Sequence, residues 1–122
     1  MSATTDFSSS TERHGDCVTL ALVGDVDVLE VGAVRRSLND ALIDGCSLLV
    51  VDLSGVTFMD SVGLGVLVAA WKRARVLRVD MVVWRPSPPV ATVLSLTALD
   101  RVLRVDVRDE HPGVDEHRTA AG

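Results

Sequence analysis

Apolar residues along the chain switch between the two-residue period of a strand and the spacing of three and four residues that is typical of a helix. Compact apolar runs predict strands over residues 17–23, 48–53 and 79–84, and the second run is continuous enough to be covered on both faces of a sheet. Residues 102–107 alternate apolar and polar side chains, which favours a strand at the edge of that sheet. A turn is expected at Ser54-Gly55.

Helices are predicted between these strands. The first covers residues 31–42 and stops before Gly45, a residue type that is common just after a helix. The second carries an apolar stripe over residues 64–74 and ends in basic residues, which suit the helix dipole. The third begins at Ser87-Pro88-Pro89, where serine can cap the helix and proline fits the first turn. Strands that alternate with helices predict an α/β domain with a largely parallel sheet.

The two ends of the chain are polar and predict flexible tails. Residues 1–14 and 108–122 show no apolar periodicity, which leaves residues 15–107 for the folded part. A chain of 122 residues has room for one domain with a modest core.

Composition and charge narrow the classes of partner. Apolar residues make up 48% of the chain and aromatic residues only 3%, so aromatic stacking on nucleic-acid bases is not expected. The net charge of −5, with scattered basic residues, argues against DNA and anionic membranes. No run approaches the about 20 apolar residues of a membrane span, and the N-terminus lacks the layout of a signal peptide, so we expect a cytoplasmic protein.

Cysteine and histidine spacing predicts neither a redox site nor a metal site. Cys17 and Cys46 are single thiols in apolar segments, which favours reduced cysteines over a disulfide. His14, His111 and His117 lie in the predicted tails with no partner at zinc spacing. We expect no metal ion and no cofactor.

The segment Asp60–Gly65 carries the most informative chemistry, because it lies between a predicted buried strand and a predicted helix. A serine at a helix N-terminus lies beside unpaired backbone N–H groups and the positive end of the dipole, so Ser61 has a setting that accommodates a phosphate. Gly63 and Gly65 keep the first turn bare, which lets a partner's backbone or a nucleotide approach closely. A simpler interpretation is that Asp60 or Ser61 only caps the helix and that the glycines serve packing.

Two other interpretations of this segment fail. A nucleophilic serine in a Gly-x-Ser-x-Gly elbow would need glycine where Met59 stands, and the histidines lie in the predicted tails. A dinucleotide fingerprint that begins at Gly63 would need a third glycine where Val68 stands. We therefore do not expect an enzyme.

Residues 50–70, VVDLSGVTFMDSVGLGVLVAA, resemble the signature of the STAS-domain anti-sigma factor antagonists, in which a strand leads through Phe-Met-Asp-Ser into a Gly-Leu-Gly helix. Residues 24–27, Gly-Asp-Val-Asp, are similar to the family's Gly-Glu-Leu-Asp turn, and residues 87–100 resemble its Ser-Pro helix start and apolar-Asp ending. The resemblance covers residues 16–107. It implies a single STAS-type α/β domain with a mostly parallel mixed sheet of four to five strands and three to four helices.

The resemblance implies a phosphorylation switch at Ser61. The matching serine of the family is phosphorylated by an anti-sigma factor that is itself a serine kinase, and a serine phosphatase resets the switch. Asp27 matches an acidic residue close to that serine, whereas Asp25 stands where the family usually has glutamate. Val62 stands where many members have a second hydroxyl residue, and Leu77-Arg78 lacks the glycines that the family commonly has in that turn.

The resemblance also implies a partner-binding face. The expected face consists of Asp25, Asp27, Asp60, Ser61, Val62, Gly63, Leu64 and Gly65. With Ser61 unmodified, this face would bind the anti-sigma factor kinase and free a sigma factor, and phosphorylation would release the kinase. The alternative is a STAS-type subunit that binds its partner constitutively, or a small-ligand sensor, without phosphorylation.

Overall fold

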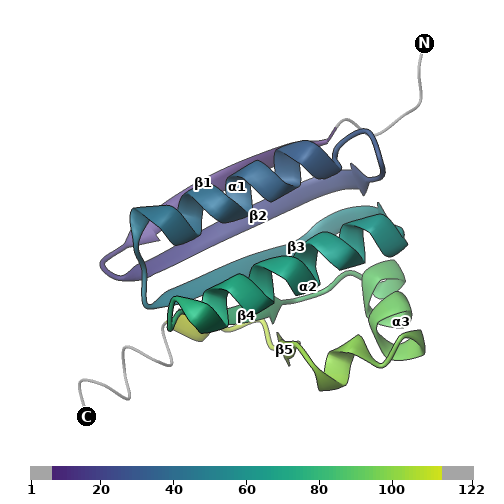
Figure 1. The fold of residues 1–122 in the computed structure, drawn as a ribbon. Helices are drawn as coiled ribbons and strands as arrows, with labels where there is room; N and C mark the ends of the chain where they lie inside the picture. The colour runs from purple at the N-terminus through teal and green to yellow at the C-terminus, as the bar shows by residue number, and fades with distance from the viewer. Residues whose placement is uncertain (1–6, 114–122) are drawn as a thin grey trace.

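A computed structural model describes residues 7–113 as a five-stranded mixed sheet with helices packed on it (Figure 1). The strands are β1 (Ser8–His14), β2 (Cys17–Val26), β3 (Leu48–Met59), β4 (Asp80–Trp84) and β5 (Arg104–Asp106), and they lie in this order in the sheet. The helices are α1 (Val31–Asp44), α2 (Ser61–Val76), α3 (Pro88–Leu96) and the short 3-10 helix η1 (Leu99–Arg101). β1 is antiparallel to β2 and all other neighbours are parallel. The predicted α/β fold is confirmed.

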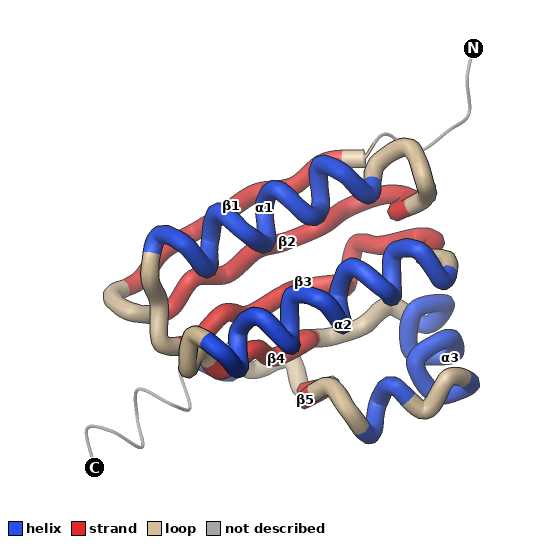
Figure 2. Tube along the Cα trace, in the orientation of Figure 1, coloured by secondary structure: helices blue, strands red, loops and turns tan. Residues whose placement is uncertain are grey.

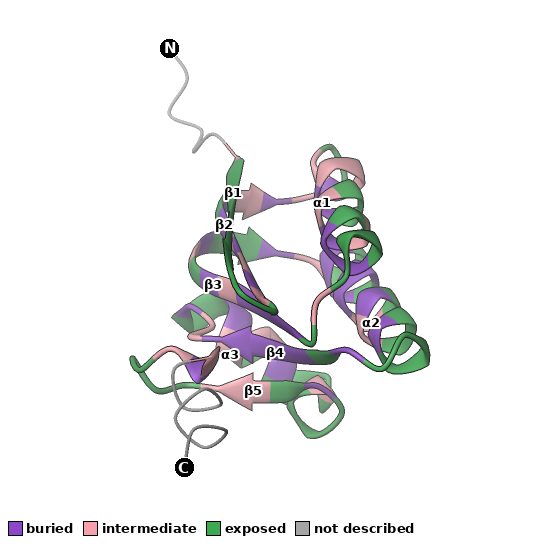
Figure 3. Ribbon diagram, turned by 90° about the vertical axis from the view of Figure 1, so that its left-hand side faces the viewer, coloured by how far each residue is buried: buried purple, intermediate pink, exposed green. Residues whose placement is uncertain are grey.

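The main core lies between one face of the sheet and helices α1 and α2, which run side by side over it (Figure 3). Helix α3 joins the same core through Val90 and Leu94, next to β3. The largest of its fully buried side chains are aliphatic: Leu20, Leu22, Leu38, Leu49, Leu53, Leu67 and Leu94. Because full burial of a leucine contributes about 1.5–3 kcal/mol, these aliphatic side chains provide much of the packing between the sheet and the helices.

Strand β1 differs from the prediction, since residues 8–14 were expected to belong to a flexible tail. They pair with β2 along their whole length, from Ser8 opposite Val23 to His14 opposite Cys17. All seven residues of β1 are exposed, so the strand shows no apolar alternation and is held by backbone hydrogen bonds to β2.

The predicted C-terminal tail also begins as part of the folded structure. Residues 108–113 are placed against the sheet, and Pro112 is buried. The remaining parts of the predicted tails, residues 1–6 and 114–122 with His117, lie outside the described residues.

Strand β3 is longer than predicted, because no turn forms at Ser54-Gly55. The strand continues to Met59, and the pairing with β2 instead contains register shifts between residues 21 and 23 and between residues 24 and 25. A Cβ atom at Gly55 would lie 3.0 Å from Val23 Cγ2. Glycine therefore permits the close approach of β2 here, and the extended β3 carries residues 60 and 61 to the edge of the sheet.

The helix ends follow the predictions in part. Gly45 ends α1 with a φ of 88°, as expected of a C-terminal glycine. Ser87 lies at the N-cap of α3, but its side chain does not cap the helix; its Oγ donates a hydrogen bond of 2.5 Å to the buried Val56 carbonyl of β3. Arg78, which follows α2, has a φ of 61°, a conformation that glycine adopts at lower cost.

Candidate functional site

The predicted site residues converge on the edge of the sheet where β2 and β3 end. Figure 2 shows that the β2–α1 and β3–α2 loops lie at the same end of these parallel strands. The last residue pairs are Asp25 with Phe58 and Val26 with Met59, so the loops begin next to each other. The carboxyl ends of parallel strands are the usual place of binding sites in open α/β sheets.

Asp60 is the N-cap of α2. Its Oδ1 accepts hydrogen bonds from the backbone N–H groups of Val62 at 3.0 Å and Gly63 at 3.1 Å. Such a cap contributes about 0.5–2 kcal/mol of stability. The capping role that the sequence left open between two residues therefore belongs to Asp60, and two of the N–H groups that the sequence offered to a phosphate are already occupied.

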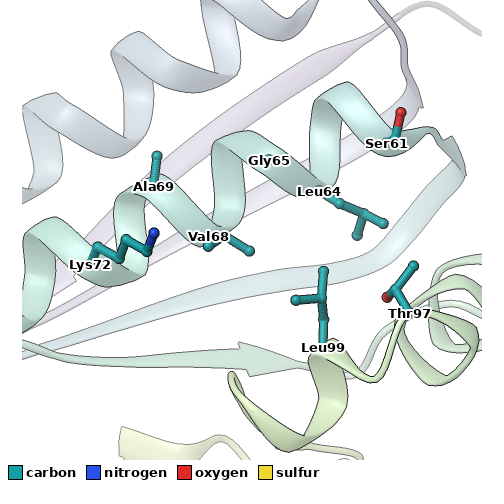
Figure 4. Close-up of a pocket in the computed structure, with 8 residues that line it drawn as sticks. All are labelled: Ser61, Leu64, Gly65, Val68, Ala69, Lys72, Thr97 and Leu99. Carbon is teal, nitrogen blue, oxygen red and sulfur yellow. The ribbon is translucent and has the colours of Figure 1, made fainter.

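Ser61 is the first residue of α2 and is exposed. Within residues 7–113 its hydroxyl has no hydrogen-bond partner, so it contributes neither a cap nor a tertiary contact. In Figure 4 the Ser61 oxygen points away from Thr97 and Leu99. The hydroxyl is therefore accessible to an enzyme that modifies it.

The carboxylates of β2 and its following loop are held by local hydrogen bonds. Asp25 Oδ1 accepts a short hydrogen bond from the Thr57 hydroxyl of the neighbouring strand. Asp27 Oδ1 accepts the backbone N–H of Leu29 at 2.9 Å, which fixes the start of the β2–α1 loop. Both aspartates are half-buried, and these hydrogen bonds hold their carboxylates in place. Thr57 was not among the predicted site residues. Alternation along β3 places its side chain on the same face of the sheet as Gly55, and its hydroxyl reaches Asp25 of the neighbouring strand β2.

These acidic residues do not form a metal site. Among residues 7–113, no three His, Cys, Asp or Glu side chains lie close enough together to hold an ion. Asp25, Asp27 and Asp60 make this edge acidic.

The two glycines of the motif have different surroundings. Gly63 is buried, and a Cβ atom there would lie 2.8 Å from Met59 Cγ and 3.2 Å from Val26 Cγ1. Gly65 is exposed, and a Cβ atom there would meet nothing within 4 Å. The bare surface that the sequence assigned to both glycines is therefore present only at Gly65, whereas Gly63 is required for packing.

An apolar rim surrounds the acidic edge. Its members are substantially exposed: Val28 64%, Leu29 84%, Phe58 48% and Val62 43%. Only Val62 was predicted as part of the site. Clustered apolar side chains rimmed by polar residues mark interaction surfaces, so this edge has the composition of a protein-binding face.

A shallow groove of about 400 Å³ continues the site along α2. It lies between α2 and the segment that joins α3 to η1, as Figure 4 shows. Its lining residues are Ser61, Leu64, Gly65, Val68, Ala69, Lys72, Thr97 and Leu99. Leu64 is almost fully buried, so it forms part of the groove floor, and Lys72 supplies the one basic group of the lining.

Known proteins resemble the chain over almost all of its described length. Residues 8–111 match the family model described as "STAS domain". The anti-sigma-B factor antagonist of Listeria monocytogenes is 28% identical over 94 residues, which cover 77% of this chain and 82% of that protein. The anti-sigma-F factor antagonist RsfB of Mycobacterium tuberculosis is 32% identical over 69 residues, 57% of each chain.

The solved structures show the same fold. An anti-sigma factor antagonist from Mycobacterium paratuberculosis matches with a TM-score of 0.79 at 26% identity, covering 98% of this chain and 97% of that one. No helix within residues 7–113 is both long and apolar enough to cross a membrane.

Proposed function

The chain belongs to the STAS domain family, and we propose that it is an anti-sigma factor antagonist that acts by partner switching. With Ser61 unmodified, the protein binds an anti-sigma factor kinase and frees a sigma factor. Phosphorylation of Ser61 by that kinase, with ATP as donor, releases the complex, and a serine phosphatase restores the binding form. The protein is the substrate of the kinase and not an enzyme. The antagonists named above support the general role.

The observation that carries the proposal is the position of the Ser61 hydroxyl. It is exposed and has no hydrogen-bond partner in the described part of the chain, at the edge where Asp25, Asp27 and Asp60 converge. A serine needed for capping or packing would have its hydroxyl engaged. Because Asp60 already caps α2, Ser61 is free to serve as a phosphate acceptor.

The binding face combines apolar contact with negative charge. The exposed side chains of Val28, Leu29, Phe58 and Val62 provide apolar area around Ser61. The groove extends this area along α2, and Gly65 leaves it open to a partner side chain. A partner that fits would offer apolar side chains toward these exposed residues and basic groups toward the aspartates.

Release follows from the charge of the phosphate. Phosphorylation adds about −1.5 to −2 charge units at one exposed point. Asp60 occupies the backbone donors of Val62 and Gly63, so these donors do not neutralise the phosphate. A partner that docks here would have to desolvate the phosphate beside the carboxylates. A cost of about 2.8 kcal/mol, within the several kcal/mol of like-charge contact, weakens binding about a hundredfold.

The same charge leaves the fold of this protein intact. Ser61 is the first residue of α2, where the helix dipole favours a negative charge by about 0.3–1 kcal/mol. The nearby Asp60 carboxylate acts in the opposite direction. We therefore expect phosphorylation to change the affinity for the partner without a large conformational change.

Binding to a purified anti-sigma factor kinase, measured by calorimetry with ADP, tests this proposal. Ser61→Ala is expected to bind like the wild type, and Ser61→Asp is expected to bind at least about tenfold more weakly with an unchanged circular-dichroism spectrum. Ser10→Asp, which adds the same charge on the exposed strand β1, is the matched control and is expected to bind normally. Equal binding of Ser61→Asp and the wild type would instead support a constitutive binding subunit or ligand sensor.

A further inference from the structure

Residues 107–113, here called the strap, cross the face of the sheet that is opposite α1 and α2. At β4, the Trp84 indole Nε1 donates a hydrogen bond of 2.8 Å to the Arg108 carbonyl. At β2, the Thr19 hydroxyl lies 2.7 Å from His111 Nε2. Because β3 lies between β2 and β4, the strap spans three neighbouring strands.

The strap covers the smaller apolar cluster of the protein. This cluster consists of Leu48, Val50, Val82 and Trp84, with Cys17 packed against it. The His111 ring contacts the Trp84 ring edge-on, with centroids 4.8 Å apart, and Pro112 is buried. Without the strap this apolar strip of the sheet would face water.

The hydrogen bonds of His111 define its protonation state in the closed strap. The Gly113 backbone N–H donates to His111 Nδ1 at 2.8 Å, so Nδ1 carries no proton. The proton of the neutral ring then lies on Nε2, which donates to the Thr19 hydroxyl. A second proton would convert Nδ1 into a donor that faces the Gly113 donor, and that hydrogen bond would be lost.

We propose that the strap is a pH-sensitive closure: the neutral imidazole of His111 latches it across the sheet, and protonation of the ring releases it. Burial of the ring lowers the pKa of His111, and the charges of His14 and Arg85 lower it further. Asp52 and Glu12 raise this pKa, but Asp52 is already paired with Arg85 at 2.9 Å. The surroundings therefore favour the neutral ring in the closed strap.

Cys17, the titratable residue that faces the strap from β2, does not change the preference of His111 for the neutral ring. Burial raises the pKa of the Cys17 thiol, so the thiol stays neutral over the range in which histidine titrates. The charged residues of the strap itself, Arg108, Asp109 and Glu110, are exposed. Protonated His111 would lose the hydrogen bond that Nδ1 accepts from the Gly113 backbone N–H.

Acidification therefore opens the strap. The pKa of His111 is lower in the closed state, so the open state binds the proton more tightly. Closure is strongest above the open-state pKa of about 6.5 and weakens as the pH falls toward the lower pKa of the closed ring. As the pH falls between these two pKa values, the ratio of open to closed strap rises by up to about tenfold per pH unit. Below the pKa of the closed ring the ratio is constant.

The test follows hydrogen exchange in ¹H–¹⁵N NMR spectra of the full chain between about pH 7.5 and pH 5, corrected for the intrinsic pH dependence of exchange. As the pH falls, exchange of the Trp84 indole N–H and of the Gly113 amide is expected to become faster, with a single midpoint below about pH 6.5. The indole N–H of Trp71, which lies on α2, is the internal control and is expected to show no such midpoint. His111→Asn stays neutral and keeps an acceptor near the Nδ1 position, so the midpoint is expected to disappear.

Further variants separate the outcomes. His14→Asn removes a neighbouring histidine but leaves His111 in place, and we expect the midpoint in the exchange of the Trp84 indole N–H to persist in this variant. In Gly113→Ala a Cβ atom would lie 2.9 Å from Cys17 Sγ, so faster exchange of the Trp84 indole N–H is expected at every pH. The proposal is overturned if His111 titrates with no change in exchange, if the midpoint persists in His111→Asn, or if Gly113→Ala exchanges like the wild type.

Discussion

Gly63 and Gly65 lie two residues apart in the first turns of α2, and an added methyl group is expected to have opposite effects at the two positions. At Gly63 a Cβ atom would lie 2.8 Å from Met59 Cγ and 3.2 Å from Val26 Cγ1, so buried side chains must shift. At Gly65 the methyl group would meet no atom within 4 Å. The comparison therefore applies one chemical change to a packed and an open position of the same helix.

The two effects can be assigned magnitudes. Overpacking costs about 1–3 kcal/mol, whereas alanine in place of glycine within a helix contributes about 0.5–1 kcal/mol. We expect Gly63→Ala to lower the free energy of unfolding by about 1–2 kcal/mol, because part of the overpacking cost is offset by helix propensity. Gly65→Ala is expected to raise it by about 0.5–1 kcal/mol.

Urea denaturation followed by circular dichroism measures both variants, with a common m value as the check that the unfolded states are comparable. Equal free energies of unfolding for the two variants, or a lower value for Gly65→Ala, would contradict the packing assigned to these two glycines. Gly65→Leu extends the comparison to function: it is expected to keep the fold, fill part of the groove and weaken binding of the anti-sigma factor kinase.

The same denaturation experiment tests four further residues. Asp60→Ala is expected to lower the free energy of unfolding by about 1 kcal/mol through loss of the α2 cap, while Ser61→Ala changes it by less than about 0.5 kcal/mol. Ser87→Ala is expected to cost about 1–3 kcal/mol, because the buried Val56 carbonyl loses its hydrogen-bond donor. Arg78→Gly is expected to raise the free energy of unfolding by up to about 1 kcal/mol, because the φ of 61° is less costly for glycine. An unchanged value for Asp60→Ala, Ser87→Ala or Arg78→Gly would contradict the contact or conformation assigned to that residue.

The core of the sheet could be predicted from apolar patterning, but its edges could not. Strands β2, β3 and β4 bury alternate or continuous aliphatic residues, which produces a readable signal. β1 is exposed at every position and is held by backbone pairing, so its side chains carry no period. The Gly15-Asp16 pair was the available signal, because two residues of this kind favour a tight hairpin turn, and Gly15 has a φ of 60°.

Glycine was the least reliable guide to local structure. Gly55 was interpreted as part of a turn, yet it lies within β3, where its missing side chain makes room for Val23. Gly63 and Gly65 look alike in the sequence, and only the packing around them separates a core position from an open one. Such distinctions depend in part on packing against the neighbouring strand β2, through Val23 at Gly55 and Val26 at Gly63.

The aspartates and Ser61 of the candidate site were predicted together with the apolar Val62 and Leu64. Thr57 and the exposed Val28, Leu29 and Phe58 were not predicted. Asp25 and Asp60 lie at the ends of parallel strands, as a βαβ arrangement requires. Thr57 supports Asp25 from the neighbouring strand, and this contact depends on the register of β2 against β3. The exposure of Phe58 likewise depends on the extension of β3 beyond the predicted turn.

The most direct test of the account adds ATP to the complex of the protein with an anti-sigma factor kinase and follows intact mass and complex stability together. The wild type is expected to gain one phosphate, which peptide mapping places on Ser61, and the complex is expected to dissociate as the phosphate appears. Ser61→Ala is expected to gain no phosphate and to stay bound. Dissociation of the Ser61→Ala complex by ATP, or a wild-type complex that survives phosphorylation of Ser61, would contradict the account.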